Sequence, residues 1–199
     1  MATQPFTESL QNVPNPVQVQ TASQSWLREQ LQNFKSASNP QSLLTTNSER
    51  KENRLVTKLS VGRMYLFHYD PKTKDTLPYY DRFPLIFPFR KVDDGFYGIN
   101  LHYLPHVLRA RLMDSLYTLV NNTNNDDTTK LKISYQILDS SSRFKYFKPC
   151  VKHYLNSHVK SRFLWVPADH WKTALFLPLE RFEKASTTTV WKQSRRSVK

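Results

Sequence analysis

All three glycines of this 199-residue chain lie between Gly62 and Gly98, in a stretch rich in aromatic residues. Glycine allows backbone conformations and close approaches that other residues resist, so the tightest backbone geometry is expected in this stretch. The same scarcity argues against a glycine-rich loop that cradles a nucleotide phosphate, and no such motif occurs elsewhere in the chain. The constraint therefore favours a small sheet with tight turns rather than a nucleotide-binding fold.

The segment Val61–Asp70 carries the clearest alternation of large side chains. One face would hold Tyr65, Phe67 and Tyr69, and the other Met64, Leu66 and His68. Large residues on both faces predict a strand that is buried on both sides.

Two further segments predict neighbouring strands. Phe83–Phe89 is apolar but contains Pro84 and Pro88, which confine it to an edge strand or an irregular connection because proline cannot donate a ladder hydrogen bond. Gly95–Tyr103 predicts a third strand that enters from an Asp-Asp-Gly turn, with Gly98 at a bulge or a close approach.

After Pro105 the apolar residues recur with helical spacing. Pro105–Val120 predicts a helix with Arg109 off its apolar face, and Lys130–Asp139 fits either a strand or a helix. Further helices are predicted over Cys150–Lys160 and over Ala168–Leu177. The expected fold class is thus α+β.

The expected architecture is a small, strongly bent antiparallel sheet from about Leu59 to Tyr103, forming a partly open barrel, with helices packed on it. The chain divides into a polar arm (1–55), a single α+β domain (56–186) and a basic, extended C-terminal tail (187–199). The predicted core includes Tyr65, Phe67, Phe87, Phe96, Tyr97, Leu108, Leu112, Leu116, Leu155 and Phe163.

The polar arm is rich in Gln, Asn, Ser and Thr, a composition that does not pack by itself. One piece of it differs, because Ser25–Lys35 has an apolar stripe at helical spacing. We expect a short amphipathic helix that docks on the domain or on a partner. Its docking residues would be Trp26, Leu27, Leu31 and Phe34.

The net charge of +13 is concentrated in one part of the chain. Residues 1–50 are neutral and residues 51–140 carry a net +3, whereas residues 141–199 carry +10. Aromatic residues are interleaved with these cations, as on surfaces that bind a phosphate backbone and stack on bases. The alternative is that the aromatic residues are core and the cations form a solvated face, or one that meets an acidic protein.

The candidate nucleic-acid-binding residues are all basic and all lie in this last segment. They are Arg143, Lys145, Lys148, Lys152, Lys160, Arg162, Arg195 and Arg196. They would contact DNA phosphates without reading base sequence.

Catalytic chemistry finds little support in the sequence. The single cysteine, Cys150, excludes an intramolecular disulfide, and His102 and His106 have Pro105 between them, which makes a shared metal site doubtful. Aspartates around the sheet, Asp81 among them, keep a metal-dependent nuclease as a third hypothesis. We expect no catalytic residue, no metal ligand and no cofactor, and neither a secretory signal nor a membrane helix.

Four blocks carry a resemblance to a known family: GRMYLFHYDPKTKDTLPYYDRFPLIFPF, DDGFYGINLHYLPHVLRARLMDSL, KPCVKHYLNSHVKSRFLWVP and LPLERFEKASTTTVWKQSRR. Over about Leu59 to Arg196 the chain resembles virion proteins of T-even-like contractile-tailed phages, in particular marine ones. The group carries the DNA end-protector (head-completion) name, with a tail or baseplate component as the other label.

The end-protector label implies a protein that associates with the packaged DNA terminus near the portal and shields it from host exonuclease after injection. The baseplate label implies that the same cations face acidic neighbouring subunits. In both cases the expected place is the virion, assembled in the host cytoplasm. The expected partners are other virion proteins, of the portal and neck or of the tail and baseplate, and double-stranded DNA, with no membrane and no small-molecule substrate.

Overall fold

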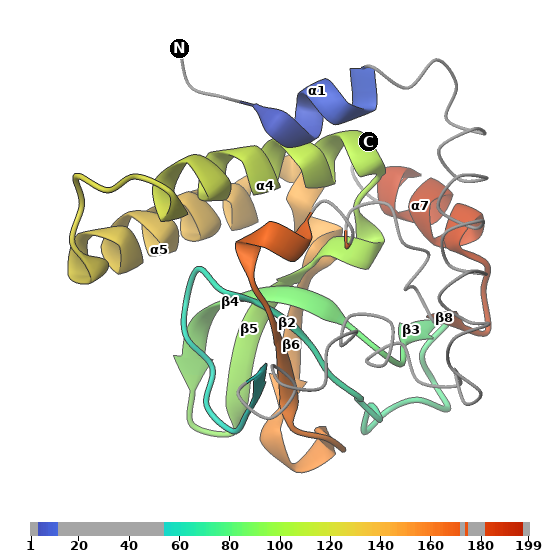
Figure 1. The fold of residues 1–199 in the computed structure, drawn as a ribbon. Coiled ribbons are helices and arrows are strands. Elements are labelled where there is room, and N and C mark those ends of the chain that lie inside the picture. The colour runs from blue at the N-terminus through green and yellow to red at the C-terminus, as the bar shows by residue number, and fades with distance from the viewer. Residues whose placement is uncertain (1–3, 12–53, 172–173, 175–181, 197–199) are drawn as a thin grey trace, which may run out of the picture.

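The computed structural model describes residues 4–11, 54–171, 174 and 182–196. Within them the chain folds as α+β, with helices packed on a mostly antiparallel sheet (Figure 1). The predicted docking helix over Ser25–Lys35, with Trp26, Leu27, Leu31 and Phe34, lies outside the described residues. No helix in the described ranges is both long and apolar enough to span a bilayer.

The main sheet has six strands in the order β1-β7-β2-β4-β5-β6, and every neighbouring pair is antiparallel. The strands are β1 (Leu55–Val56), β2 (Met64–Leu66), β4 (Leu85–Val92), β5 (Gly95–Asn100), β6 (Val151–Leu155) and β7 (Phe163–Val166). A separate two-stranded ribbon pairs β3 (Tyr80–Asp81) with β8 (Phe182–Glu183).

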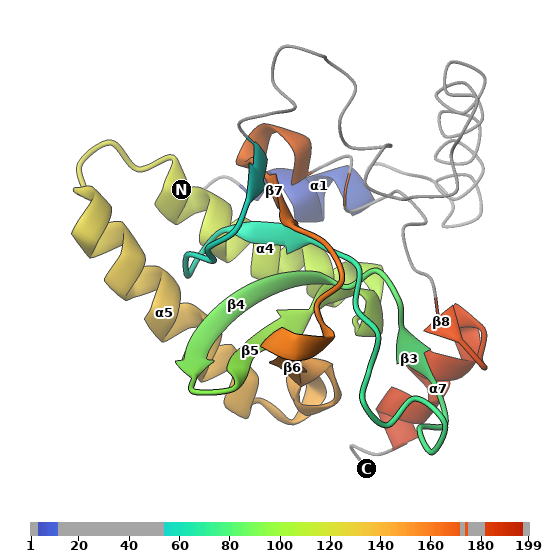
Figure 2. The same cartoon turned by 90° about the horizontal axis from the view of Figure 1, so that it is seen from below.

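The sheet curls into an open half-barrel. The rings of Phe96 on β5 and Phe163 on β7 lie 5.7 Å apart, although β4 and β2 separate their strands. In a flat sheet, three strand spacings would put them about 14 Å apart. Only strong curvature brings the two rings together, and Figure 2 shows β4 following such a curve. The predicted bent antiparallel sheet is confirmed.

The two faces of β2 enter two different cores. Met64 and Leu66 belong to the main core, which lies under the helices and includes Leu112 and Leu116. Tyr65 and the following Phe67 belong to an aromatic cluster on the concave side of the sheet. The predicted double burial of this strand is confirmed.

The predicted core residues are largely inside. Those that are buried are Tyr65, Phe67, Phe87, Phe96, Leu112, Leu116 and Phe163. Tyr97, Leu108 and Leu155 are partly buried.

The prediction for the proline-containing segment is wrong, because β4 lies in the middle of the sheet between β2 and β5. The register of the β4–β5 pair shifts between Pro88 and Arg90, so Phe89 is an extra residue. A β-bulge of this kind leaves a position without a ladder hydrogen bond, which is what a proline requires. Gly98 pairs with Pro88 there, as the predicted close approach requires.

Two antiparallel helices cover the convex face of the sheet, α4 (His106–Val120) and α5 (Asp127–Arg143), and they lie side by side in Figure 1. The first confirms the predicted helix. The second resolves the ambiguous segment as helical, and Asp126 caps it by accepting the backbone N–H of Thr129 at 2.7 Å.

The predicted helix over Cys150–Lys160 is wrong. Its first half is β6, and a 3₁₀ turn, η4 (Asn156–His158), follows. Apolar residues at 151, 154, 155 and 159 fit a helix locally, but pairing with β5 satisfies the backbone instead and brings Tyr154 into the aromatic cluster. The sheet is therefore completed by strands that follow the helices, rather than ending at Tyr103.

The C-terminal segment also differs from the prediction, because residues 187–196 form helix α7 (Thr187–Arg196) instead of an extended tail. The helix buries Val190 and Ser194 on one side. The Ser186 hydroxyl accepts the backbone N–H of Thr189 at 3.3 Å and so supports the first turn.

The expected polar arm differs at its beginning as well. Helix α1 (Pro5–Gln11) packs on α4, and the side chain of Phe6 is only 3% exposed. The carboxylate of Asp114 on α4 accepts the backbone N–H groups of Phe6 at 2.8 Å and Thr7 at 2.9 Å. These residues are therefore part of the domain.

Candidate nucleic-acid interface

The eight predicted cations separate into four places in the fold. Arg143, Lys145 and Lys148 lie where α5 ends, Lys152 lies in β6, Lys160 and Arg162 follow β6, and Arg195 and Arg196 end α7. The strand β6 lies between the first group and the pair at 160 and 162, so the eight cations come from four separate places along the fold.

The first group forms a surface that we call the aromatic–basic turn, residues 143–148, with sequence RFKYFK. It contains three cations and no acid. Phe144 is 66% exposed and Tyr146 is 62% exposed, the highest values among the exposed large hydrophobic residues of the described chain. Exposed rings flanked by cations are the groups that stack on bases while phosphates are neutralised.

The local backbone explains why these rings point outward. Phe144 leaves the helical conformation and starts the 3₁₀ helix η3 (Lys145–Cys150), whose Phe147 N–H donates to the Phe144 carbonyl at 2.9 Å. The buried Cys150 and the partly buried Phe147 hold this helix against the core. The tight turn therefore leaves Phe144 and Tyr146 on the solvent side.

Burial also decides the chemistry of Cys150. Its removal from water raises the pKa of the thiol to about 12, so the thiol stays protonated at neutral pH. Because the thiolate is the reactive form of cysteine, these surroundings do not activate Cys150 as a nucleophile.

The cations of the turn differ in whether they form an ion pair with a carboxylate. Asp139 forms ion pairs with both Arg143 and Arg90, the latter at 2.9 Å, so the Arg143 charge is partly neutralised. Within the described part of the chain, no carboxylate forms an ion pair with Lys145 or Lys148. These two lysines carry the available positive charge of the turn.

The pair at the other end of β6 is exposed too. The backbone N–H of Lys160 donates to the carbonyl of His68 at 2.9 Å, and its ammonium donates to the Ser157 carbonyl at 3.3 Å. Arg162 is exposed beside it. This pair is a second basic surface without an exposed aromatic residue of its own.

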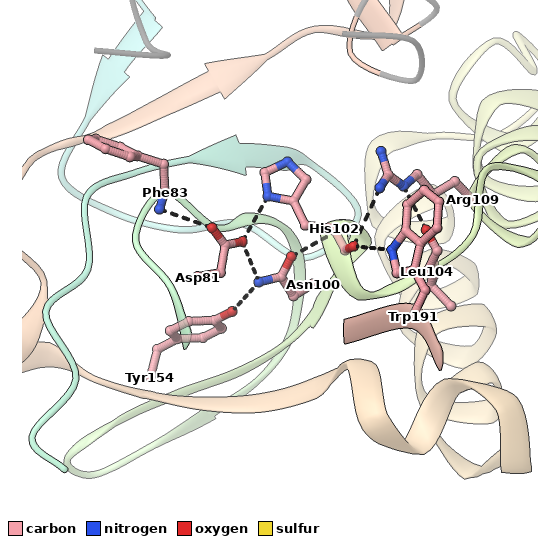
Figure 3. Close-up of polar contacts among 8 residues, drawn as sticks. All are labelled: Asp81, Phe83, Asn100, His102, Leu104, Arg109, Tyr154 and Trp191. Atoms are coloured by element: carbon pink, nitrogen blue, oxygen red, sulfur yellow. Dashed lines mark hydrogen bonds and ion pairs between the residues drawn. The ribbon is translucent and has the colours of Figure 1, made fainter. Parts of the chain in front are cut away.

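A buried polar network joins the elements around η2 (Leu101–Tyr103), as Figure 3 shows. The Asp81 carboxylate accepts the backbone N–H of Phe83 at 3.1 Å and the side-chain amide of Asn100 at 2.9 Å. It also lies 2.7 Å from Nδ1 of His102. Asn100 also donates to the Tyr154 hydroxyl at 3.1 Å. Asp81, a candidate in the nuclease hypothesis, is thus engaged in the interior.

Arg109 differs from its prediction. It was expected off the apolar face, yet it is fully buried, and its Nε donates to the Leu104 carbonyl at 2.9 Å. Its guanidinium lies 5.7 Å from the ring centroid of Trp191 on α7, whose indole N–H donates to the His102 carbonyl (Figure 3). Sequence periodicity misses such a residue because its charge is satisfied by carbonyls that only the tertiary structure supplies.

Other His and Asp side chains around the sheet have partners of their own. His106 packs edge-on against Trp191, Asp70 pairs with Lys74, and Asp94 lies 3.1 Å from His153. In the described ranges, no group of three or more His, Cys, Asp or Glu side chains could hold a metal ion.

Lys152 lies at a partly buried position in β6, which the sequence did not predict. It shares a strand face with Tyr154, and its ammonium lies 4.1 Å from the ring centroid of Tyr103. Burial lowers the pKa of Lys152, because little water remains to solvate its charge. Alternation along a strand would place Lys152 on the same face as Tyr154. The segment also fits a helix, however, and a helix was predicted.

The comparison with known proteins gives one match. No curated protein and no solved structure matches the chain. A family model described as Phage T4 terminal DNA protecting protein matches residues 7–194. The match includes residues 7–11 of α1 and the segment up to Leu59, which the sequence resemblance left out. The chain therefore belongs to the phage T4 terminal DNA protecting protein family.

Proposed function

We propose that this chain is a non-catalytic virion protein that binds the end of a DNA duplex and shields it from exonucleases. The family name supports DNA ends as the target. The observation that carries the proposal is the aromatic–basic turn, where Phe144 and Tyr146 are exposed beside Lys145 and Lys148, which form no ion pair within the described residues.

A duplex end differs from the rest of the helix because its last base pair exposes a bare aromatic face. An exposed ring that stacks on this face gains about 1–3 kcal/mol per base and distinguishes an end from continuous DNA. Lys145 and Lys148 would meanwhile neutralise the nearest phosphates. These contacts fix position and affinity but carry no sequence information.

The arginines at the end of α7 extend the basic character of the proposed surface. Arg195 and Arg196 are exposed, α7 contains no acid, and the helix contacts η3, which forms most of the turn. A surface with cations on two elements can contact phosphates on both strands of an end.

The first experiment measures the binding of the full chain to a short blunt duplex, with a covalently closed circle as competitor. We expect linear ends to compete at least tenfold better than the same mass of circular DNA. We also expect log affinity to fall linearly with log salt. Equal competition by the circle, or no binding at about 50 mM salt, would overturn end binding.

Two variants and one matched control locate the surface. Lys145→Ala with Lys148→Ala should lower the salt slope by about 2, and Phe144→Ala with Tyr146→Ala should abolish the preference for ends. The control, Lys160→Ala with Arg162→Ala, removes the same charge beyond the other end of β6. An equal loss in the control would show that charge alone binds DNA and that the turn has no special role.

The competing hypotheses have their own readouts. A nuclease would cleave DNA in the presence of magnesium or manganese, in a manner abolished by Asp81→Ala; we expect the DNA to remain intact. A baseplate component would lie against acidic subunits, so the position of this chain in a virion map separates that hypothesis from a place near the DNA end.

A further inference from the structure

A cavity of about 330 Å³ opens between the β3 segment and β6. Five tyrosines line it: Tyr69, Tyr79, Tyr80, Tyr103 and Tyr154. Its charged groups are Lys152, Lys72 and Asp81. Ligand sites in proteins usually start at about 300 Å³, so this cavity suits a single small ligand.

The charge inside the cavity is unbalanced. The two oxygens of the Asp81 carboxylate already accept from Phe83, Asn100 and His102, and this residue is only 5% exposed. The ammonium of Lys152 has only the Tyr103 ring as a close partner among the contacts of the described chain. A largely buried cation facing a ring rather than a carboxylate favours an anion as ligand.

Hydroxyl groups add donors for such an anion. The Tyr69 hydroxyl accepts the backbone N–H of Leu155 at 3.2 Å, and the Tyr154 hydroxyl accepts the amide of Asn100. Since each hydroxyl uses a lone pair in these contacts, its proton can be donated. Burial raises the pKa of both tyrosines, so both protons are present at neutral pH.

The cavity is also close to the proposed DNA surface. Lys152 lies at the start of β6, directly after η3, which contains Lys145 and Lys148. An extended chain advances about 3.3 Å per residue, so Lys152 is within about 13 Å of Lys148. This upper limit is short enough for the terminal segment of a strand, at a duplex end held at the turn, to reach the cavity.

We propose that this cavity binds the 5′-terminal nucleotide of a DNA strand, with its phosphate at Lys152 and its base against the tyrosine walls. The assignment rests on the proposed end binding for the source of the nucleotide. The chemistry of the cavity itself calls for a nucleoside monophosphate, in which a planar ring and an anionic group occur together.

The test of the cavity uses the full chain and a mononucleotide. Calorimetric titration with a 5′-deoxynucleoside monophosphate should give an affinity at least tenfold higher than that for the nucleoside without phosphate. Lys152→Met should remove this difference, and Lys132→Met, at an exposed lysine of α5, should leave it unchanged. Equal affinities for the two ligands, or an unchanged preference in Lys152→Met, would overturn the proposal.

Loss of folding is separated from loss of the ligand contact by thermal unfolding. Methionine keeps the length of the lysine stem and removes a desolvated charge, so the melting temperature of Lys152→Met should not fall. Lys72→Met, at the exposed rim, provides a second variant that should weaken nucleotide binding by a smaller factor. If neither lysine variant weakens binding, the phosphate is not held at this cavity.

Binding to duplex DNA shows whether the bound nucleotide is the terminus of a DNA strand or a free nucleotide. A blunt duplex with 5′-phosphates should bind about tenfold more tightly than one with 5′-hydroxyls, and Lys152→Met should abolish the difference. Mononucleotide binding without this difference would show a site for free nucleotides and overturn the terminal assignment. End binding that ignores the phosphate, with no mononucleotide bound, would overturn the cavity and leave the proposed function intact. Absence of all end binding would overturn the proposed function itself.

Discussion

The indole N–H of Trp191 on α7 donates to the backbone carbonyl of His102 at 2.8 Å (Figure 3). The same carbonyl accepts from the guanidinium of Arg109 at 3.4 Å. One backbone oxygen thus joins the C-terminal helix to η2 and α4. Because the basic end of α7 carries Arg195 and Arg196, this contact positions charge as well as stabilising the fold.

Trp191→Phe should therefore weaken the attachment of α7 while an aromatic ring still fills the space of the indole. The ring remains to pack, but the hydrogen bond is lost and the contact with Arg109 weakens, so the free energy of unfolding should fall by about 1–3 kcal/mol. Urea unfolding measures the change, with Lys192→Ala, exposed on the same helix, as the control. A loss no larger than that of the control would mean that α7 is held by other contacts.

Phe6→Ala should show that the first helix is part of the core. Its ring packs edge-on against Tyr117, with centroids 5.2 Å apart, and lies 6.3 Å from Trp171. Removing a buried phenyl ring costs about 3–5 kcal/mol. Glu8→Ala, at an exposed position of α1, should change stability little, and equal stability of the two variants would contradict the packing of α1.

The glycines of β5 should differ in their tolerance of a methyl group. A Cβ at Gly95 would lie 2.0 Å from the carbonyl oxygen of Tyr154, whereas one at Gly98 would lie 2.9 Å from the Cδ1 atom of Ile86. A carbonyl in a strand ladder cannot move aside, but the end of an isoleucine can. Gly95→Ala should cost about 3 kcal/mol or more and Gly98→Ala about 1 kcal/mol. Thermal unfolding of the two variants tests this order, and the reverse order would contradict the β5–β6 register.

Stability should fall steeply in alkaline solution. Burial raises the pKa of Tyr103 and of Tyr154 above the ordinary value of 10.0. Below that pH both the folded and the unfolded chain keep these protons, so the two buried tyrosines make their full contribution to the free energy of unfolding there. As pH rises past 10, the unfolded chain loses its protons first, and each tyrosine costs about 1.4 kcal/mol per pH unit until its folded pKa is reached.

Tyr103→Phe is the variant that checks this linkage. It should flatten the decline of melting temperature between about pH 9.5 and 11.5. Tyr146→Phe, at a 62% exposed position, should leave the decline unchanged. Parallel curves for the wild type and Tyr103→Phe would show that its ionisation is not coupled to folding.

The candidate site was only partly accessible to sequence reasoning. The density of cations and rings in residues 141–199 is a property of the sequence, so composition indicated this segment, which contains the aromatic–basic turn, without knowledge of the fold. The exposure of Phe144 and the burial of Lys152 are not local. Both depend on how η3 and β6 pack, and the sequence predicted a helix where β6 lies.

The sequence by itself determined the α+β class, the two-sided burial of β2, the position of α4 and the concentration of charge in the last third. These follow from alternation, spacing and composition, which act over a few neighbouring residues. Only the tertiary structure decided that β4 is central, that residues 151–155 and 163–166 complete the sheet, and that residues 187–196 form a helix. For the strands, the backbone hydrogen bonds come from partners distant in the chain. The hydrogen bonds of α7 are local, but the surface on which it buries Val190 is distant in the chain, and in both cases that free energy exceeds the local preference.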